Sequence, residues 1–266
     1  MAWYPVHAAA GAVRLIGAGL PNTGTQSLTE ALEILGYRPI HGHDTYFNLT
    51  MRKAWGDWLH LGKDFQPALE TLLDNGFDAT LDVPMCMAFR ELMKRYPDAK
   101  VLLSVRDSAE EWYRSSLVKS SPPGPLMELY LRWHSWYLGL RRDEHRHQFC
   151  RRNQASYNCS FLDEQTPEIR ARCLEGYRGH IERVKQSVPS ERLLVYNVKE
   201  GWGPLSRFLG VAEPTETFPA MDFTKSSGRR SNWRVIFRPD FWERALEPTL
   251  VLFVPLLTSC CLCICW

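Results

Sequence analysis

A glycine-rich turn near the N-terminus constrains the fold of this chain more than any other feature. An apolar run over 13–18 leads to Gly19, four residues separate it from Gly24, and a helical pattern begins at Thr25. This order of strand, tight loop and helix is typical of α/β proteins that bind phosphate groups. A nucleotide-hydrolysing loop would need lysine and then serine or threonine where this chain has Thr25 and Gln26. The loop therefore predicts binding of a phosphate or sulfate without magnesium-dependent hydrolysis.

The rest of the chain alternates strand and helix patterns. Apolar runs predict strands or short extended pieces over 13–18, 37–40, 78–83, 100–105 and 192–197. Helical periodicity predicts helices over 25–35, 51–61, 65–73, 85–95, 109–118, 167–188 and 204–209, and leaves the boundaries within 126–159 open. Connections of helical length require parallel strands, so we expect a parallel sheet covered on both faces. Ligands bind such sheets beyond the carboxyl ends of the strands, where the glycine loop, Asp82 and Arg106 all fall.

Composition excludes several classes of protein. The 266 residues fit one α/β domain, and the net charge of +2 gives no reason to expect a nucleic-acid partner. No signal-peptide pattern opens the chain, so we expect a cytoplasmic location. His41 and His43 suggest a metal site, but no third ligand is suitably spaced, and we expect no metal. Cysteines outside the C-terminal tail lack the C-x-x-C spacing and are expected to be free thiols: Cys86, Cys150, Cys159 and Cys173.

The candidate site residues also have simpler interpretations. Asp82 precedes Val83 and Pro84 and could serve only to cap the next helix. Arg106 could form a solvated ion pair with the neighbouring Asp107. Both alternatives stay open at the level of sequence.

A nicotinamide-binding site is a further alternative. Gly17 and Gly19 match the first two glycines of the dinucleotide fingerprint, but Asn22 stands in place of the third. The fingerprint also expects an acidic residue at the end of a second strand, and none is placed there. An NAD-dependent oxidoreductase is therefore the weaker interpretation.

Several motifs, in the same order, resemble the sulfotransferase-like family of P-loop proteins, whose members read G-x-G-L-P-R-T-G-T-x-S-L. The similarity covers residues 13–223 with gaps. It rests on the motifs GAGLPNTGTQSL, FDATLDVPMCMAF, VLLSVRDSAEEWYRSS and VYNVKEGWGPLSRFLGV. It implies a P-loop-type three-layer α/β/α sandwich with a central parallel sheet. It also implies 3′-phosphoadenosine-5′-phosphosulfate as sulfuryl donor, no metal, and a small-molecule acceptor with a hydroxyl or amine group. A phosphosulfate needs a backbone cradle but no magnesium, which fits the missing lysine.

The resemblance assigns roles to individual residues. Arg106 and Ser115 resemble the pair that grips the 3′-phosphate, with Ser116 as an alternative because the spacing is one residue longer than in the tightest form of the motif. Lys225, Arg229 and Arg230 could close over the same phosphate. The loop that holds the 5′-phosphosulfate corresponds to Pro21, Asn22, Thr23, Gly24, Thr25, Gln26 and Ser27.

The catalytic assignments centre on Asp82, His41 and Asn22. Asp82 occupies the strand-end position where cytosolic sulfotransferases place a catalytic histidine, and His41 is the second candidate base. Asn22 departs from the family, which has arginine or lysine there to offset charge on the leaving group. Without that cation the alternative function is a nucleotide-binding protein with weak or absent turnover, unless Arg14 or Arg52 substitutes.

The chain divides into three predicted segments. A sulfotransferase-like domain covers 10–225, a basic and aromatic segment 226–248, and a hydrophobic, cysteine-rich tail 249–266. The tail suggests membrane attachment on the cytoplasmic side, with acylation of its cysteines as reinforcement. The alternative interpretations are a last helix packed on the domain and an aberrant tail that arises from splicing. The aromatic segment Tyr130–Tyr137 is a candidate wall of the acceptor site, and the alternative is that these aromatic side chains pack in the core.

Overall fold

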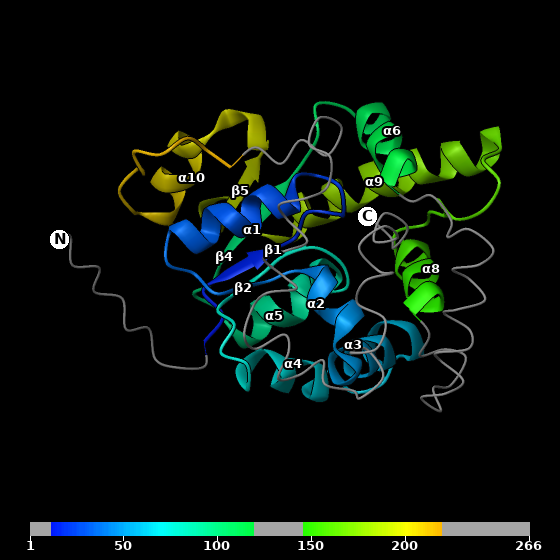
Figure 1. Ribbon diagram of the computed structural model, residues 1–266, viewed down its shortest axis with the longest axis horizontal. Coiled ribbons are helices and arrows are strands. Elements are labelled where there is room, and N and C mark those ends of the chain that lie inside the picture. Colours follow the sequence, from blue (N-terminus) through cyan, green and yellow to red (C-terminus); the bar gives the residue numbers. More distant parts are fainter. Residues whose placement is uncertain (1–11, 120–145, 220–266) are drawn as a thin grey trace, which may run out of the picture.

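The computed structural model describes residues 12–119 and 146–219, in which a parallel β-sheet lies between two layers of helices (Figure 1). The strands follow the order β2-β3-β1-β4-β5, and every neighbouring pair is parallel. This confirms the expected α/β sandwich with a parallel sheet. The strand bounds are β1 Leu15–Gly17, β2 Pro39–Ile40, β3 Ala79–Thr80, β4 Lys100–Ser104 and β5 Leu193–Tyr196.

Helices cover both faces of the sheet, with α1 and α10 on one face and α5 and α9 on the other (Figure 1). The helices are α1 Thr25–Ile34, α2 Gly42–Phe47, α3 Leu49–Leu61, α4 Gln66–Leu73, α5 Phe89–Arg95, α6 Ala109–Lys119, α8 Arg146–Ser156, α9 Pro167–Ser187 and α10 Trp202–Leu209. Short 3-10 turns are η1 Met85–Ala88, η3 Ser190–Arg192 and η4 Val198–Glu200. The predicted helix over 85–95 thus divides into η1 and α5, and α2 was not predicted.

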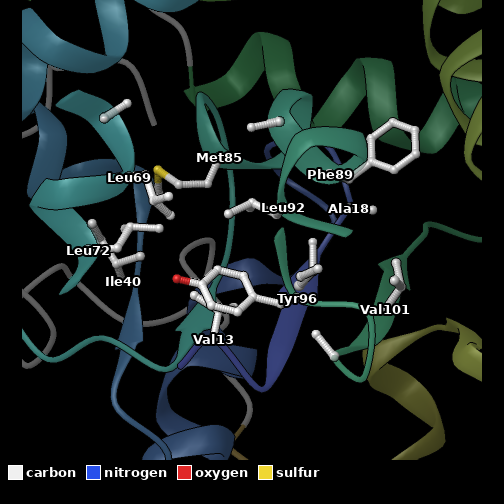
Figure 2. Packing of buried hydrophobic residues seen from close by; sticks show 14 of the residues in the cluster. Val13, Ala18, Ile40, Leu69, Leu72, Met85, Phe89, Leu92, Tyr96 and Val101 are labelled. Atoms are coloured by element: carbon white, nitrogen blue, oxygen red, sulfur yellow. The ribbon is translucent and has the colours of Figure 1, made fainter. Parts of the chain in front are cut away.

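Strand periodicity decides which layer each side chain joins. Ile16, Val101 and Leu103 point to the face covered by α5 and α9, where they pack with Leu92 and Val184. Figure 2 shows part of this cluster, with Val101 and Leu92 among its labelled residues. The opposite face carries the alternate residues, such as those next to Ile16 and Val101 on β1 and β4. On this face, Leu15 of β1 and Leu102 of β4 pack against Leu28 and Leu32 of α1 and Leu205 of α10. Two buried faces explain why the strands are apolar at nearly every position.

Cys159 and Cys173 form a disulfide across a sequence separation of 14 residues, which links the segment after α8 to α9. The prediction of free thiols is therefore wrong for this pair, and it is wrong for Cys150 as well, which is also disulfide-bonded. The two segments approach closely because α9 carries Gly176, where a Cβ atom would lie 2.1 Å from the Tyr157 carbonyl oxygen. Cys86 is a free, buried thiol, and burial followed by the Asp82 charge raises its pKa.

Replacing both Cys159 and Cys173 by serine is expected to lower the free energy of unfolding by about 3 kcal/mol, because a closed loop of about 15 residues restricts the unfolded chain by that amount. A reductant breaks the same bond in the wild type. When both proteins are unfolded by denaturant under reducing conditions, their midpoints should therefore agree. If the thiols of Cys159 and Cys173 titrate as free thiols in the native wild-type protein, the disulfide does not exist.

Several predictions concern residues outside the described part of the chain. These are the acceptor wall Tyr130–Tyr137, the basic residues Lys225, Arg229 and Arg230, and the segments 226–248 and 249–266. Within the residues that the structure describes, no helix combines the length and apolarity that crossing a membrane would require.

Candidate functional site

The phosphate loop connects β1 to α1 and turns sharply at two left-handed residues. Asn22 has a φ of 66° and Gly24 a φ of 93°. A Cβ atom at Gly24 would lie 2.5 Å from the side chain of Val198, so both the backbone conformation and the close approach of η4 require glycine. Asparagine is among the few other residues that adopt this conformation readily.

Polar contacts hold the loop from behind. The Thr23 hydroxyl donates to the Leu20 carbonyl oxygen at 2.7 Å and lies 2.6 Å from the Ser104 hydroxyl of β4. Trp112 of α6 donates its indole N–H to the Pro21 carbonyl oxygen at 2.8 Å. Because Thr23 is fully buried, these contacts fix the loop backbone against the sheet.

His180 of α9 fixes the chain just before the loop. Its Nε2 lies 2.7 Å from the Ala18 carbonyl oxygen, and burial lowers the pKa of His180 to about 4. The ring is therefore neutral at physiological pH and donates through Nε2–H.

The first turn of α1 offers N–H groups to an anion. The first helical hydrogen bond here runs from the Leu28 N–H to the Gly24 carbonyl oxygen at 3.0 Å, so the N–H groups of Thr25 and Gln26 lie outside the helical pattern. The helix dipole adds positive potential at the same point. The Gln26 Oε1 atom is buried and has no hydrogen-bond partner among the described residues. The loop residues from Pro21 to Ser27 therefore form the kind of cradle that binds a phosphate or sulfate.

Arg106, at the carboxyl end of β4, lies at the entrance of the loop. Its Nε donates to the Asn22 carbonyl oxygen at 2.7 Å, and its Nη2 lies 3.5 Å from the Ser115 hydroxyl. Its backbone N–H donates to the Tyr177 hydroxyl at 2.9 Å. The simple ion pair with Asp107 is not what holds Arg106, because the Asp107 carboxylate bonds to Lys199.

The two candidate serines of α6 have different contacts. Ser115 is the one beside the Arg106 guanidinium, whereas Ser116 is buried and accepts a hydrogen bond from the Asn22 Nδ2 at 3.1 Å. A guanidinium next to a hydroxyl can bind a phosphate with several charge-assisted hydrogen bonds. The structure therefore brings together Arg106 and Ser115, as the sequence suggested.

His41 and Asp82 form a buried pair beside the loop. The His41 Nε2 lies 3.1 Å from the Asp82 Oδ2 and 3.0 Å from the Thr25 hydroxyl. Strands β2 and β3 are parallel neighbours, so the residues just beyond their ends meet at one edge of the sheet. Only 6% of His41 and 9% of Asp82 are exposed.

Hydrogen bonds orient both members of this pair. The His41 Nδ1 accepts from the His43 N–H at 3.3 Å, so in the neutral ring Nε2 carries the hydrogen that faces Asp82. The other Asp82 oxygen accepts from the Val83 N–H at 2.7 Å, with Asp82 itself in the left-handed region at a φ of 71°. The helix-capping interpretation is wrong, because Pro84 is the N-cap residue of η1 and no side chain caps that helix; Val83, whose N–H bonds to Asp82, precedes it.

A metal at the two histidines has no further support. The His41 and His43 rings are 4.7 Å apart, but no cluster of three or more potential ligands occurs within residues 12–119 and 146–219. Of the two alternative cations, Arg14 lies away from the loop, where it pairs with Asp78 at 2.6 Å just before β1 and β3 begin. Arg52 donates to the backbone carbonyl oxygen of Tyr46.

Several residues that position this site were not predicted from the sequence. Trp112 lies between Arg106 and Ser115, so its place in the same motif was a usable signal. Tyr177 and His180 lie in the long helix α9 and had no local signal, because only the packing of α9 on the sheet brings them to the loop.

Two comparisons with known proteins bear on this site. A family model described as "Sulfotransferase domain" matches residues 14–227. The chain is also similar to a protein of Aspergillus versicolor named "Ava biosynthesis cluster protein M". The two are 30% identical over 244 residues, which cover 87% of each chain. The family match includes the phosphate loop, Asp82 and Arg106.

Proposed function

Because this chain belongs to the sulfotransferase domain family, we propose that it transfers a sulfuryl group from 3′-phosphoadenosine-5′-phosphosulfate to a small acceptor. The observation that carries the proposal is the position of Arg106, whose guanidinium bonds to the Asn22 carbonyl oxygen at the entrance of the phosphate loop. A donor with two separate phosphate-type groups suits a cradle of N–H groups next to an arginine and a serine.

The residues present fit this donor. The N–H groups at the start of α1 suit the 5′-phosphosulfate, and Arg106 with Ser115 suits the 3′-phosphate. When bound, the donor supplies an activated sulfuryl group and leaves as adenosine 3′,5′-bisphosphate.

Asp82 is the better placed of the two candidate bases. In the tautomer fixed by the His43 N–H, the His41 Nε2 already carries a hydrogen and cannot accept one. The Asp82 carboxylate can accept the proton of an acceptor hydroxyl, while His41 orients the carboxylate through Nε2–H. His41 is then a positioning residue that also contacts the loop through Thr25.

The glycines of the nicotinamide fingerprint have a different explanation in the fold. A Cβ atom at Gly17 would lie 2.2 Å from the Thr80 carbonyl oxygen, and one at Gly19 would lie 1.9 Å from the Ser104 hydroxyl. Both glycines allow neighbouring strands to approach β1 and the loop. They do not by themselves favour a dinucleotide.

A nucleotide-binding protein with little turnover is the second candidate function, and Asn22 is the observation that favours it. The Asn22 side chain donates to Ser116 and carries no charge. In the sulfotransferase-like family that the sequence resembles, the residue at this position is an arginine or lysine, whose positive charge offsets that of the leaving group. Binding without turnover is the expected behaviour if no other cation serves this purpose.

Two measurements test the proposal. Isothermal titration calorimetry should show binding of adenosine 3′,5′-bisphosphate, and incubation with the phosphosulfate donor and 2-naphthol should give the sulfate ester. Binding without product would favour the second candidate. A wild-type protein that does not bind the bisphosphate would contradict both.

Replacing Arg106 by lysine should weaken the binding of adenosine 3′,5′-bisphosphate about 10- to 100-fold, because lysine cannot bond to the phosphate, Ser115 and the Asn22 carbonyl together. The matched control is Arg192→Lys. Arg192 also donates to a backbone carbonyl oxygen, that of Ala99, but at the amino ends of the strands, opposite the site. An equal loss of affinity in both variants would contradict the assignment of Arg106 to the phosphate-binding site.

A further inference from the structure

Tyr46 of α2 is linked to the His41 and Asp82 pair through the ring of His43. Its ring lies 6.3 Å from that of His43, and the His43 ring lies 4.7 Å from that of His41. Tyr46 is almost fully buried, and burial followed by the Asp82 charge raises its pKa. The hydroxyl therefore stays protonated at physiological pH and can serve as a hydrogen-bond donor.

Contacts from two other helices fix the direction of this donor. The Asn153 Oδ1 of α8 lies 2.8 Å from the His60 Nε2 of α3, and because an amide oxygen only accepts, His60 donates. The Asn153 Nδ2 then donates to the Tyr46 hydroxyl oxygen at 3.4 Å. Phe149 packs edge-on against the Tyr46 ring at 5.5 Å and holds it in place.

The hydroxyl hydrogen of Tyr46 is left to point elsewhere. The lone pair that faces Asn153 is occupied, and no side chain or carbonyl in the described ranges accepts the hydrogen. A buried donor normally has an acceptor, so a ligand atom is the partner that this arrangement lacks.

We propose that the Tyr46 hydroxyl donates a hydrogen bond to the reacting atom of the acceptor and selects a hydroxyl group over an amine. This inference rests on the proposed sulfotransferase function. Asn153 and His60 are positioning residues, because they act by orienting Tyr46.

The selectivity follows from the number of lone pairs on the acceptor atom. A hydroxyl oxygen can accept a hydrogen bond from Tyr46 and still use a second lone pair to attack sulfur. Asp82 receives the hydroxyl proton, a new O–S bond forms, and the S–O bond to the 5′-phosphate breaks with its electron pair on the phosphate oxygen. A neutral amine has one lone pair, so the same hydrogen bond blocks its attack.

The test compares 2-naphthol with 2-naphthylamine in the wild type and in the Tyr46→Phe variant. We expect the variant to lose about tenfold in kcat/KM for 2-naphthol through a higher acceptor KM, with unchanged affinity for adenosine 3′,5′-bisphosphate. The amine should not lose rate, so the ratio of naphthol to amine turnover falls. The control is Tyr96→Phe, which also removes a buried tyrosine hydroxyl. That hydroxyl has no hydrogen-bond partner among the described residues, and Tyr96 lies just before β4, away from the strand ends that carry the site.

A second variant keeps the inference testable if Tyr46→Phe does not fold. Asn153→Leu removes the orienting amide, and its loss in acceptor kcat/KM should not add to that of Tyr46→Phe in a double-mutant cycle. Equal naphthol-to-amine ratios in the wild type and in either variant would overturn the inference and leave the proposed function intact.

A wild type that binds the bisphosphate but makes no product still gives a result. Calorimetry of 2-naphthol with the protein–bisphosphate complex should then show weaker binding to Tyr46→Phe than to the wild type. Equal or undetectable naphthol binding would overturn the inference. Failure of the bisphosphate itself to bind would instead overturn the proposed function.

Discussion

Replacing Asp82 by asparagine should lower kcat about 10²- to 10⁴-fold, the range attributed to a single general base. Asparagine retains the shape of the side chain and an oxygen that can accept from the Val83 N–H at 2.7 Å. It cannot accept the proton of an acceptor hydroxyl. Affinity for adenosine 3′,5′-bisphosphate should stay close to the wild-type value, because the carboxylate is not in the phosphate loop. Initial rates with 2-naphthol and calorimetry measure the two quantities.

The matched control is Asp78→Asn. Asp78 is a carboxylate paired with Arg14 at 2.6 Å, at the amino ends of the strands and so opposite the site. This variant can lose stability but should retain kcat. His41→Gln should cost less than Asp82→Asn, since His41 acts by orienting the carboxylate. A larger loss for His41→Gln would make the histidine the base and reject the assignment of Asp82.

Replacing Asn22 by arginine should raise the transfer rate about 10²- to 10³-fold, because it introduces a positive charge where negative charge develops on the leaving group. Two costs oppose the gain. Arginine is less favourable than asparagine at a φ of 66°, and the hydrogen bond to Ser116 is lost. Both costs act mainly on stability, so thermal unfolding should record them separately from the single-turnover rate.

Asn22→Met is the control for the arginine variant. Methionine has an unbranched side chain and meets the same backbone cost, but it has no charge. An equal rate increase in the methionine variant would show that side-chain shape, and not charge, limits turnover. No increase with arginine, in a protein that still binds the bisphosphate, would mean that another group already supplies the charge.

Sequence patterns predicted the architecture because two local rules were enough. Apolar runs separated by helical stretches require a parallel sheet, and a parallel sheet puts all strand ends at one edge. The glycine loop, Asp82 and Arg106 could therefore be expected to lie together before any coordinates were known. The loop itself followed from the spacing of Gly19 and Gly24, since both serve backbone geometry.

The pairings across the site could not be predicted in the same way. His41 meets Asp82 only because β2 lies next to β3 in the sheet, and strand order is not encoded in either motif. The short helix α2 was also missed, since His41 caps it with its ring and Asp44 completes a capping box that differs from the usual serine or threonine pattern. The disulfide of Cys159 and Cys173 arises likewise from the return of the chain onto α9.

The phosphate loop, the parallel sheet and the family resemblance could be predicted from the sequence alone, because each follows from short motifs and from their order along the chain. Tertiary structure decided which side chains meet. It separated Ser115 at Arg106 from Ser116 at Asn22, and it placed the Tyr46 hydroxyl under the control of Asn153. These contacts join residues from different helices, and their partners are fixed by packing between elements, which no local pattern records.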